Sequence, residues 1–448
     1  MEKRISKFFV ETLGCRLNRY ESEEIAYELE DAGFVKSELG DRVDLYVINS
    51  CSVTSRSDYS SRLAARRAKR NFPSATVVMT GCYAKSSQTS LLKMPEIDFI
   101  VDNSKKFSFG KLINQERAER LILADSKVDD NVQIRPIHKL DKRTNLYLKI
   151  QLGCNQSCSF CNVRIARGKS RSAKLNDVID HLKRIEPYEV SELILTGVDL
   201  GDYNDRQYLL SDLLEAILLN TTIARVRLSS INPQHVDDRL LDLIKNNDRI
   251  CSHLHIPLQS GSNRILNLMK RGYTADYYRD LILQASDKID NIGIGTDIMV
   301  GFPSESEADF LSSYKIIEEL PIMMVHAFIF SSRPLTEAYK LDDDKLLSGI
   351  VKERARLIKE LAAKKHRQKR IDQIGRFVEV LVENSKTKDG KLKGFTDNYL
   401  AVRFDGASSL MNKIVKLKIT GEAAQMLDAV LESNSSYTID EEQSRMAV

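Results

Sequence analysis

The stretch Leu148–Arg171, LKIQLGCNQSCSFCNVRIARGKSR, decides how the rest of the chain is interpreted. Its apolar, alternating start predicts a β-strand, and Cys154, Cys158 and Cys161 follow that strand at once in a CxxxCxxC spacing. Thiolates are the preferred ligands of iron–sulfur clusters and zinc. Zinc sites usually combine two CxxC pairs, whereas three thiolates on a 4Fe–4S cluster leave the fourth iron open to a substrate or cofactor. The spacing therefore predicts a catalytic cluster and not a structural metal site.

The strand before these cysteines is the first of six in a repeating pattern. Each strand candidate is followed by a helical pattern, which predicts a partial (β/α)6 barrel. Catalytic groups of such barrels lie at the carboxyl ends of the strands, where these three cysteines, the barrel triplet, also fall. The six strands are expected at residues 146–152, 192–196, 224–229, 253–258, 293–300 and 323–330.

Polar or small residues lie in or just after several of these strands, and together they predict a lined cavity. One such residue more often serves a turn, but four equivalent strand ends favour a binding site. His253 and His255 share one face of a strand and are expected to pack or to support the site, not to bind metal. The expected site residues are Thr196, Gly197, Ser229, Gln259, Ser260 and Asp297.

The first 125 residues show a shorter alternation, typical of an α/β, doubly wound, flavodoxin-like domain. Strands are expected at 7–13, 43–49, 75–80 and 97–101, with helices near 21–32, 54–70, 84–93 and 105–114. Cys15, Cys51 and Cys82, the N-terminal triplet, each follow one of the first three strands. Because the carboxyl ends of parallel strands face one crevice, these thiols are expected to meet and hold a second cluster. The alternative is that they are buried, inert cysteines, which is what we expect of Cys251.

Two basic stretches bear on the partner of the protein. Residues 61–70 read as a helix with arginines on one face, and residues 351–370 carry nine Lys or Arg against two Glu. Either stretch alone could be a solvated helix face. Two of them in a chain with cluster sites favour an anionic polymer as partner. The RNA-binding candidates are Arg62, Arg66 and Arg70 in the first stretch and Lys364, Lys365 and Arg367 in the second.

The remaining segments complete the expected organisation. Residues 376–421 hold short β-rich runs that predict a small antiparallel barrel, a type that often binds RNA. The next residues, 422–432 (EAAQMLDAVLE), predict a short helix. We expect domains at 1–125, 144–372 and 373–434, with a polar linker at 126–143 and a frayed tail at 435–448.

Composition and the N-terminal residues bear on the cellular location of the protein. No run approaches the roughly 20 apolar residues that a membrane-spanning helix needs, and the N-terminal residues lack a signal-peptide core. Thiols suited to metal binding in a chain without a secretory signal favour a reducing cytoplasm. The net charge of +4 over 448 residues does not identify a partner. We expect a cytoplasmic monomer that does not associate with membranes.

Several motifs occur in the order seen in one family. They include ETLGCRLNRYESE at 11–23, INSCSVTSRSD at 48–58, IQLGCNQSCSFCNVRIARG at 150–168 and DIMVGFPSESEADF at 297–310. The chain resembles the radical S-adenosylmethionine (SAM) methylthiotransferases along residues 11–310. Within that family, TLGCRLN and NSCSVT resemble the branch that thiomethylates C2 of N6-threonylcarbamoyladenosine 37 in the tRNA anticodon loop.

The resemblance implies two 4Fe–4S clusters and SAM as cofactors. The barrel triplet would hold the cluster that cleaves SAM reductively to a 5′-deoxyadenosyl radical, and Phe160 fits the same cofactor-binding pattern. The N-terminal triplet would hold the auxiliary cluster that carries the inserted sulfur. A C-terminal TRAM barrel and the basic helices would bind the tRNA anticodon stem-loop. An external electron donor and a sulfur donor are also implied.

Two departures and three alternatives accompany this interpretation. Leu335 stands where the family usually has glycine, and Asn232 stands where an acidic residue is common, which affects local substrate contacts. The substrate could instead be isopentenyladenosine 37 or an aspartate of a ribosomal protein. A non-catalytic iron–sulfur protein that binds RNA is the third alternative, and it would not cleave SAM.

Overall fold

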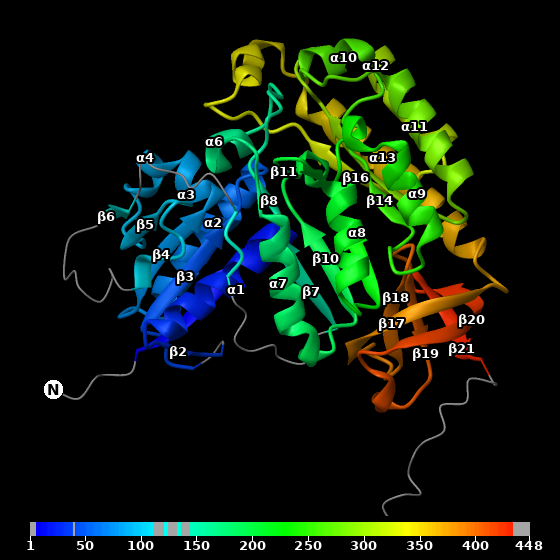
Figure 1. Cartoon of the computed structure of the whole chain (residues 1–448). Helices are drawn as coiled ribbons and strands as arrows, with labels where there is room; N and C mark the ends of the chain where they lie inside the picture. The colour runs from blue at the N-terminus through cyan, green and yellow to red at the C-terminus, as the bar shows by residue number, and fades with distance from the viewer. Residues whose placement is uncertain (1–5, 39–40, 111–120, 124–131, 136–143, 433–448) are drawn as a thin grey trace, which may run out of the picture.

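The structure is a computed structural model that describes residues 6–38, 41–110, 121–123, 132–135 and 144–432 (Figure 1). The expected tail at 435–448 and most of the expected linker at 126–143 lie outside the described residues. Within the described residues, no helix has the length and apolar character needed to cross a membrane.

The N-terminal domain is a six-stranded sheet with the strand order β2-β1-β3-β4-β5-β6. Every neighbouring pair is parallel, as the flavodoxin-like prediction requires. The strands are β1 (Lys7–Thr12), β2 (Val35–Lys36), β3 (Leu45–Ser50), β4 (Thr76–Gly81), β5 (Phe99–Val101) and β6 (Leu121–Leu123). The helices are α1 (Arg16–Asp31), α2 (Ser55–Asn71), α3 (Cys82–Ser86) and α4 (Gln88–Leu91).

Two of the four helices predicted for this domain are confirmed, as α1 and α2. Helix α2 begins where Thr54 accepts a hydrogen bond from the Ser57 backbone, a regular N-cap. The helix expected near 84–93 is two short helices, because Ser87 between them has extended φ (−139°) and interrupts the helix. Residues 105–108 of the helix expected at 105–114 form turns, and most of the remainder lies outside the described residues.

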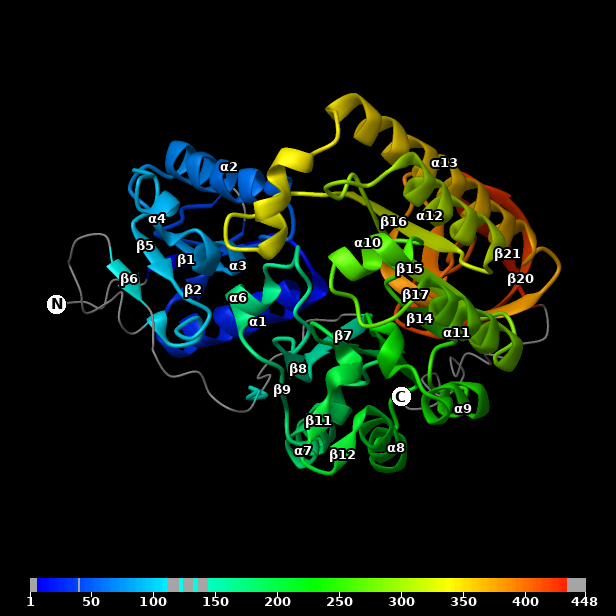
Figure 2. The same ribbon diagram turned by 90° about the horizontal axis from the view of Figure 1, so that it is seen from above.

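Six parallel strands form the central partial barrel, as predicted. They make two three-stranded sheets, β7-β10-β13 and β14-β15-β16, which isolated parallel bridges join at Val226–Ile250 and Ser230–His255. Their bounds are β7 (Asn145–Lys149), β10 (Glu192–Thr196), β13 (Arg225–Leu228), β14 (His253–His255), β15 (Gly293–Val300) and β16 (Met324–Ile329). The outer strands β7 and β16 are not paired with each other, so the barrel is open on the side that faces the N-terminal domain (Figure 2).

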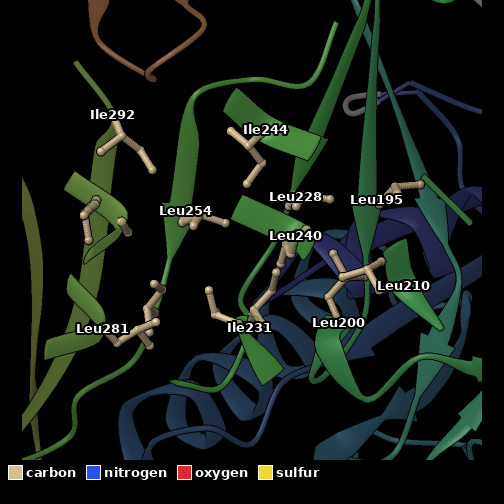
Figure 3. Close-up of a cluster of buried hydrophobic side chains, with 14 of the residues drawn as sticks. Leu195, Leu200, Leu210, Leu228, Ile231, Leu240, Ile244, Leu254, Leu281 and Ile292 are labelled. Carbon is tan, nitrogen blue, oxygen red and sulfur yellow. The ribbon is translucent and has the colours of Figure 1, made fainter. Parts of the chain in front are cut away.

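Helices cover the outer face of the barrel sheet. The main ones are α7 (Leu175–Ile185), α8 (Leu210–Asn220), α9 (Asp238–Asn246), α11 (Ala275–Lys288), α12 (Glu307–Glu319) and α13 (Ser348–Ile371). Leu195, Leu228 and Leu254 of the strands pack with Leu210 and Leu240 of the helices in one buried cluster (Figure 3). Each such side chain contributes about 1.5–3 kcal/mol by leaving water. The packed outer face therefore holds the strand ends in place.

The C-terminal residues form a closed barrel in the order β17-β18-β19-β21-β20. The bounds are β17 (Phe377–Lys386), β18 (Leu392–Thr396), β19 (Ala401–Phe404), β20 (Ile414–Ala423) and β21 (Met426–Leu431). The prediction of a short helix at 422–432 is wrong. Ala424 and Gln425 have φ of +52° and +65° and form a tight hairpin turn. Leu427 and Ala429 alternate into the barrel core, so the two-residue period of a strand prevails over helix propensity.

Buried ion pairs join the N-terminal domain to the central barrel. Glu24 of α1 pairs with Lys149 of β7 at 2.5 Å. Glu21 of α1 pairs with Arg167, which follows the barrel triplet, and with Lys106, at 2.7 Å each. All of these groups are buried, and removing one partner would leave an uncompensated charge. The two domains are therefore fixed relative to each other beside the cysteines.

Candidate active site

The two cysteine triplets meet in one cavity. The cavity has a volume of about 590 Å³ and lies between the carboxyl ends of the barrel strands and those of the N-terminal sheet. We call it the chamber. All six predicted cysteine ligands line it: Cys15, Cys51, Cys82, Cys154, Cys158 and Cys161. Cys251 lies elsewhere and is buried in the protein, as expected of a core residue.

The N-terminal triplet is assembled by tight turns at three strand ends. Gly14 and Gly81 have φ of +98° and +94°, a region that favours glycine. A Cβ on Gly81 would lie 2.3 Å from the Ser50 carbonyl oxygen, so only glycine lets these loops approach. The Asn18 amide donates to the Leu13 and Ser50 carbonyls at 2.7 and 3.0 Å. Asn18 therefore ties the loop of Cys15 to the loop that precedes the second cysteine.

The barrel triplet is held by local contacts. It lies in the loop after β8 (Gln151–Leu152), which begins with Gly153 at φ +74°. Backbone amides donate to two of the sulfurs at 3.4 Å, from Gln156 to Cys154 and from Val163 to Cys161. Such donors stabilise thiolate charge. The sequence spacing alone thus builds most of this site.

One sulfur of each triplet accepts a hydrogen bond from an arginine, and the two arginines are different residues. The Arg167 Nε lies 3.2 Å from the Cys82 Sγ, and the Arg271 Nη1 lies 3.2 Å from the Cys158 Sγ. Arg167 is oriented by two hydrogen bonds to the Glu21 carboxylate, at 2.7 and 3.0 Å. Neither arginine was predicted from the sequence pattern.

The titration behaviour of the thiols and of Glu21 follows from burial and charge. Burial raises the pKa of Cys154 to about 12 and that of Cys161 to about 11. Burial also raises the pKa of Cys15 and of Cys51. Burial would raise the pKa of Glu21, but Arg167 and Lys106 outweigh it and hold that pKa well below its ordinary value. Metal must therefore displace protons from buried thiols.

The donor set fits iron–sulfur clusters better than single metal ions. A tetrahedral zinc site with Zn–S bonds of about 2.3 Å brings its sulfurs to within about 4 Å of one another. Among the described residues, the one trio of His, Cys, Asp or Glu whose ligand atoms lie within 4.8 Å of one another is His255, Asp297 and His326. Neither cysteine triplet is that compact. In a cluster each thiolate binds a different iron, which suits the wider spacing.

Most of the expected cofactor-binding residues line the chamber, and one does not. Ser260 is fully buried, and its hydroxyl lies 3.2 Å from the Ser262 backbone nitrogen and 3.4 Å from the Ser313 Oγ. Gln259, at φ +69°, turns the chain between the chamber and Ser260. The expected residues that line the chamber are Phe160, Thr196, Gly197, Ser229, Gln259 and Asp297.

Asp297 is the centre of a group of three side chains, of which only Asp297 and His255 were predicted from the sequence. Its Oδ1 lies 3.2 Å from the His255 Nε2 and 3.3 Å from the His326 Nδ1. These two histidines outweigh burial and hold the pKa of Asp297 well below its ordinary value. Gly295 leaves room for the His255 ring, since a Cβ there would lie 2.9 Å from its Nδ1. His255 supports the site as expected, whereas His326 was missed because a lone histidine in a strand carries no local signal.

Asn232, one of the two departures from the family pattern, has a defined role. Its side chain donates to the Asp199 Oδ2 at 2.5 Å and accepts from the Arg271 Nη2 at 2.5 Å. The acidic group at this point of the site is thus Asp199, with Asn232 as the bridge to the arginine that contacts Cys158. Leu335, the other departure, is exposed in the segment that follows β16.

The C-terminal barrel supplies part of the chamber wall. Tyr399, at φ +71°, stacks on Phe395 with ring centroids 5.1 Å apart. Its hydroxyl accepts a hydrogen bond of 2.5 Å from Arg16, the residue after Cys15. The buried Arg227 of β13 donates to the Thr396 and Asp397 carbonyls at 3.1 and 2.7 Å, which fixes this turn of the barrel.

The expected RNA-binding residues lie outside the chamber and differ in their contacts. Arg62 donates to the Tyr83 hydroxyl, and Arg66 lies 3.7 Å from Glu96. Arg70 and Lys364 are exposed. Lys365 donates to two backbone carbonyls of residues 318–320, and Arg367 lies 3.6 Å from Glu422. The candidates of the first stretch therefore contact Tyr83 and Glu96, whereas those of the second contact residues 318–320 and Glu422.

Comparisons with known proteins agree with the fold. A family model described as the radical SAM superfamily matches residues 148–317, and one described as the uncharacterized protein family UPF0004 matches residues 7–102. A solved structure of TsrM, a radical S-adenosylmethionine methyltransferase from Kitasatospora setae, is similar in fold. Its TM-score is 0.57 at 14% identity, over 75% of each chain. The fold and the cysteine-lined chamber thus define a radical SAM protein.

Curated relatives specify the family. A protein of Aquifex aeolicus named Threonylcarbamoyladenosine tRNA methylthiotransferase MtaB is 36% identical over 92% of this chain and 100% of its own length. A protein of that name from Bacillus subtilis is 32% identical over 91% of this chain and 92% of its own. An Aquifex aeolicus tRNA-2-methylthio-N(6)-dimethylallyladenosine synthase is 31% identical over 95% and 98%, respectively. The chain belongs to the tRNA methylthiotransferase family of radical SAM enzymes.

Proposed function

We propose that this protein adds a methylthio group to C2 of N6-threonylcarbamoyladenosine 37 in the anticodon loop of tRNA. The observation that carries the proposal is the chamber, where cysteine triplets from two domains line one cavity of about 590 Å³. A reaction that needs both radical formation and sulfur insertion requires the two sites to face one substrate atom. The names of the two most similar relatives described above support the choice of nucleoside.

The cysteines would hold two 4Fe–4S clusters, and the protein would supply binding and orientation. A cluster on the barrel triplet, with SAM, supplies the radical chemistry needed at a ring carbon that has no leaving group. Arg167 and Arg271 donate to one sulfur of each triplet and stabilise the negative charge there. Thr196, Ser229, Gln259 and Asp297 line the space beside the barrel triplet and are the proposed SAM contacts.

The partners follow from this function. The chain would need an external electron donor and a sulfur donor, and we propose that it acts as a monomer in the cytoplasm, where tRNA is modified. The C-terminal barrel would serve as the TRAM-type RNA-binding domain. We propose that the domains span residues 1–125, 144–372 and 373–434. An anticodon-loop base suits this fold because it can be reached without opening a duplex.

An anaerobic assay tests the proposal. The protein is reconstituted, its iron and sulfide are counted, and it is incubated with SAM, dithionite and tRNA that carries threonylcarbamoyladenosine. We expect about eight irons per chain and a methylthio adduct on that nucleoside by mass spectrometry. An adduct only on isopentenyladenosine, the nucleoside class that the 31% identical relative is named for, would replace the substrate. An adduct on a ribosomal protein would do the same, and no SAM cleavage would overturn the enzyme class.

A further inference from the structure

A second cavity lies directly outside the chamber. It has a volume of about 930 Å³, and we call it the lateral groove. Its lining comes from the start of α2 (54–56), from β16 and the segment after it (327–334), and from the first half of α13. Strand β16 is an edge strand on the open side of the barrel, and Phe328 lines both the lateral groove and the chamber. A ligand in the groove would therefore reach the chamber past one strand.

The charge of the lateral groove has one sign. Its described lining contains four basic residues, Arg56, Lys345, Lys352 and Lys359, and no acidic residue. Arg56, Lys352 and Lys359 are exposed and make no ion pair with any residue in the described parts of the chain. Lys352 and Lys359 are two helical turns apart on one face of α13, or roughly 10 Å along its axis. The groove therefore offers separate cationic groups along its length.

The same groove carries aromatic and hydroxyl groups. Phe328, Phe330 and Tyr339 line it, and Tyr339 is 43% exposed. The hydroxyls of Ser55 and Ser331 meet at 2.5 Å where the segment after β16 touches α2 (Figure 2). Cationic groups that follow a backbone, together with aromatic rings on which bases stack, are the features of a site for single-stranded nucleic acid.

The second half of α13 differs from the first. The cavity beside it has a volume of about 620 Å³ and is lined by Lys364, Lys365 and Lys369, but also by Asp290, Glu318 and Asp372. Lys365 is held by backbone carbonyls, as described above. Mixed charge attracts a polyanion less than a field of one sign. The first half of the helix is therefore the better surface for a phosphate backbone.

We infer that the lateral groove binds the single-stranded anticodon-loop RNA next to the modified nucleotide and guides that nucleotide past β16 into the chamber. The inference rests on the proposed function and adds the surface that delivers the substrate. Lys352, Lys359 and Arg56 contact phosphates, and Tyr339 offers a ring for a base. Because phosphate contacts carry no sequence information, this binding does not depend on whether the nucleoside is already modified.

Charge reversal on the reconstituted full-length protein tests the inference. The variant K352E/K359E is compared with K183E/K245E, which makes the same change in net charge on exposed lysines of α7 and α9. Binding of a fluorescent anticodon stem-loop is measured by anisotropy over a range of salt concentrations. We expect K352E/K359E to lose at least about tenfold in affinity and to reduce the salt slope by about 1.4, from two lost phosphate contacts. K183E/K245E should stay close to the parent.

Each outcome supports or overturns the inference. Equal losses in both double variants would show a general charge effect, and no loss in K352E/K359E would exclude the groove. If K352E/K359E does not fold, as judged by its melting temperature and iron content, K352Q/K359Q takes its place. A parent protein that binds no tRNA at all would overturn the proposed function itself. A parent that binds and modifies tRNA, with a groove variant that binds equally well, would overturn only the lateral groove.

Discussion

The two cysteine triplets line one chamber but are built in different ways. The barrel triplet spans eight residues of one loop, and backbone amides of that loop donate to two of its sulfurs. The N-terminal triplet comes from three strand ends, 36 and 31 residues apart, and depends on the sheet for its shape. Each triplet then receives one arginine from outside its own segment. The first site thus depends mainly on a loop, and the second on the packing of two domains.

The largest effects are expected from removing cysteines, and they should differ between the triplets. C158A should abolish SAM cleavage, because the open iron is lost with its cluster. C51A should keep SAM cleavage but yield no methylthio product. Iron should fall by about half, or about four atoms, in each variant. Iron content, 5′-deoxyadenosine and nucleoside adducts are measured on the same anaerobic samples, and loss of both clusters in C158A would show that the triplets are not independent.

Breaking the buried arginine contact should affect the N-terminal triplet and the fold together. Arg167 bridges Cys82 and Glu21, and it is buried. R167M should lower the free energy of unfolding by about 3–5 kcal/mol, since it leaves part of the Glu21 charge uncompensated. Thermal unfolding and iron content provide the measurement. R271M is the matched control, because Arg271 contacts Asn232 and Tyr273 rather than a carboxylate. A loss as large in R271M would contradict the distinction between the two sites.

Acid should destabilise the scaffold independently of both clusters. Burial lowers the pKa of His181 on α7 from 6.5 to about 4, and its Nε2 has no hydrogen-bond partner among the residues that the structure describes. His181 therefore takes up a proton near pH 6.5 in the unfolded chain but only near pH 4 in the folded protein. The free energy of unfolding falls as the pH drops through this window. Between pH 7 and 5 the loss is roughly 2 kcal/mol. The thermal stability of H181L should fall less than that of the parent over this pH range. A pH dependence equal to that of the parent would refute the role of His181.

The smallest effect is expected at the bridge beside the barrel triplet. Asn232 connects Asp199 to Arg271, which donates to Cys158. N232A should slow SAM cleavage by about tenfold, or about 1.4 kcal/mol, because Arg271 loses one of the groups that orient it. The iron content of both sites should not change. Single-turnover formation of 5′-deoxyadenosine is the measurement, and loss of iron from the N-terminal triplet would show that this bridge also supports the other site.

The comparison also explains which parts of the site could be predicted from the sequence. The barrel triplet was evident because its ligands are neighbours, and the N-terminal triplet followed from the rule that parallel strands end at one edge. Arg167 and Arg271 could not be found in this way, because they lie 85 and 113 positions from the cysteines that they contact. The fold class was confirmed, but the helix expected at 422–432 was not. Its Ala, Glu and Leu favour a helix, whereas closing the barrel required a strand.

The contact between Tyr399 and Arg16 has a consequence for how the domains can be separated or exchanged. The C-terminal barrel reaches the residue next to Cys15 and lines the chamber there. Deleting that barrel would remove part of the chamber wall and also any RNA contacts that the barrel makes. An effect of the truncation could therefore not be assigned to RNA binding alone. In chimeras between relatives, Tyr399 and Arg16 should be inherited as a pair, although the two positions lie 383 residues apart. The C-terminal barrel therefore also forms part of the site at the N-terminal triplet.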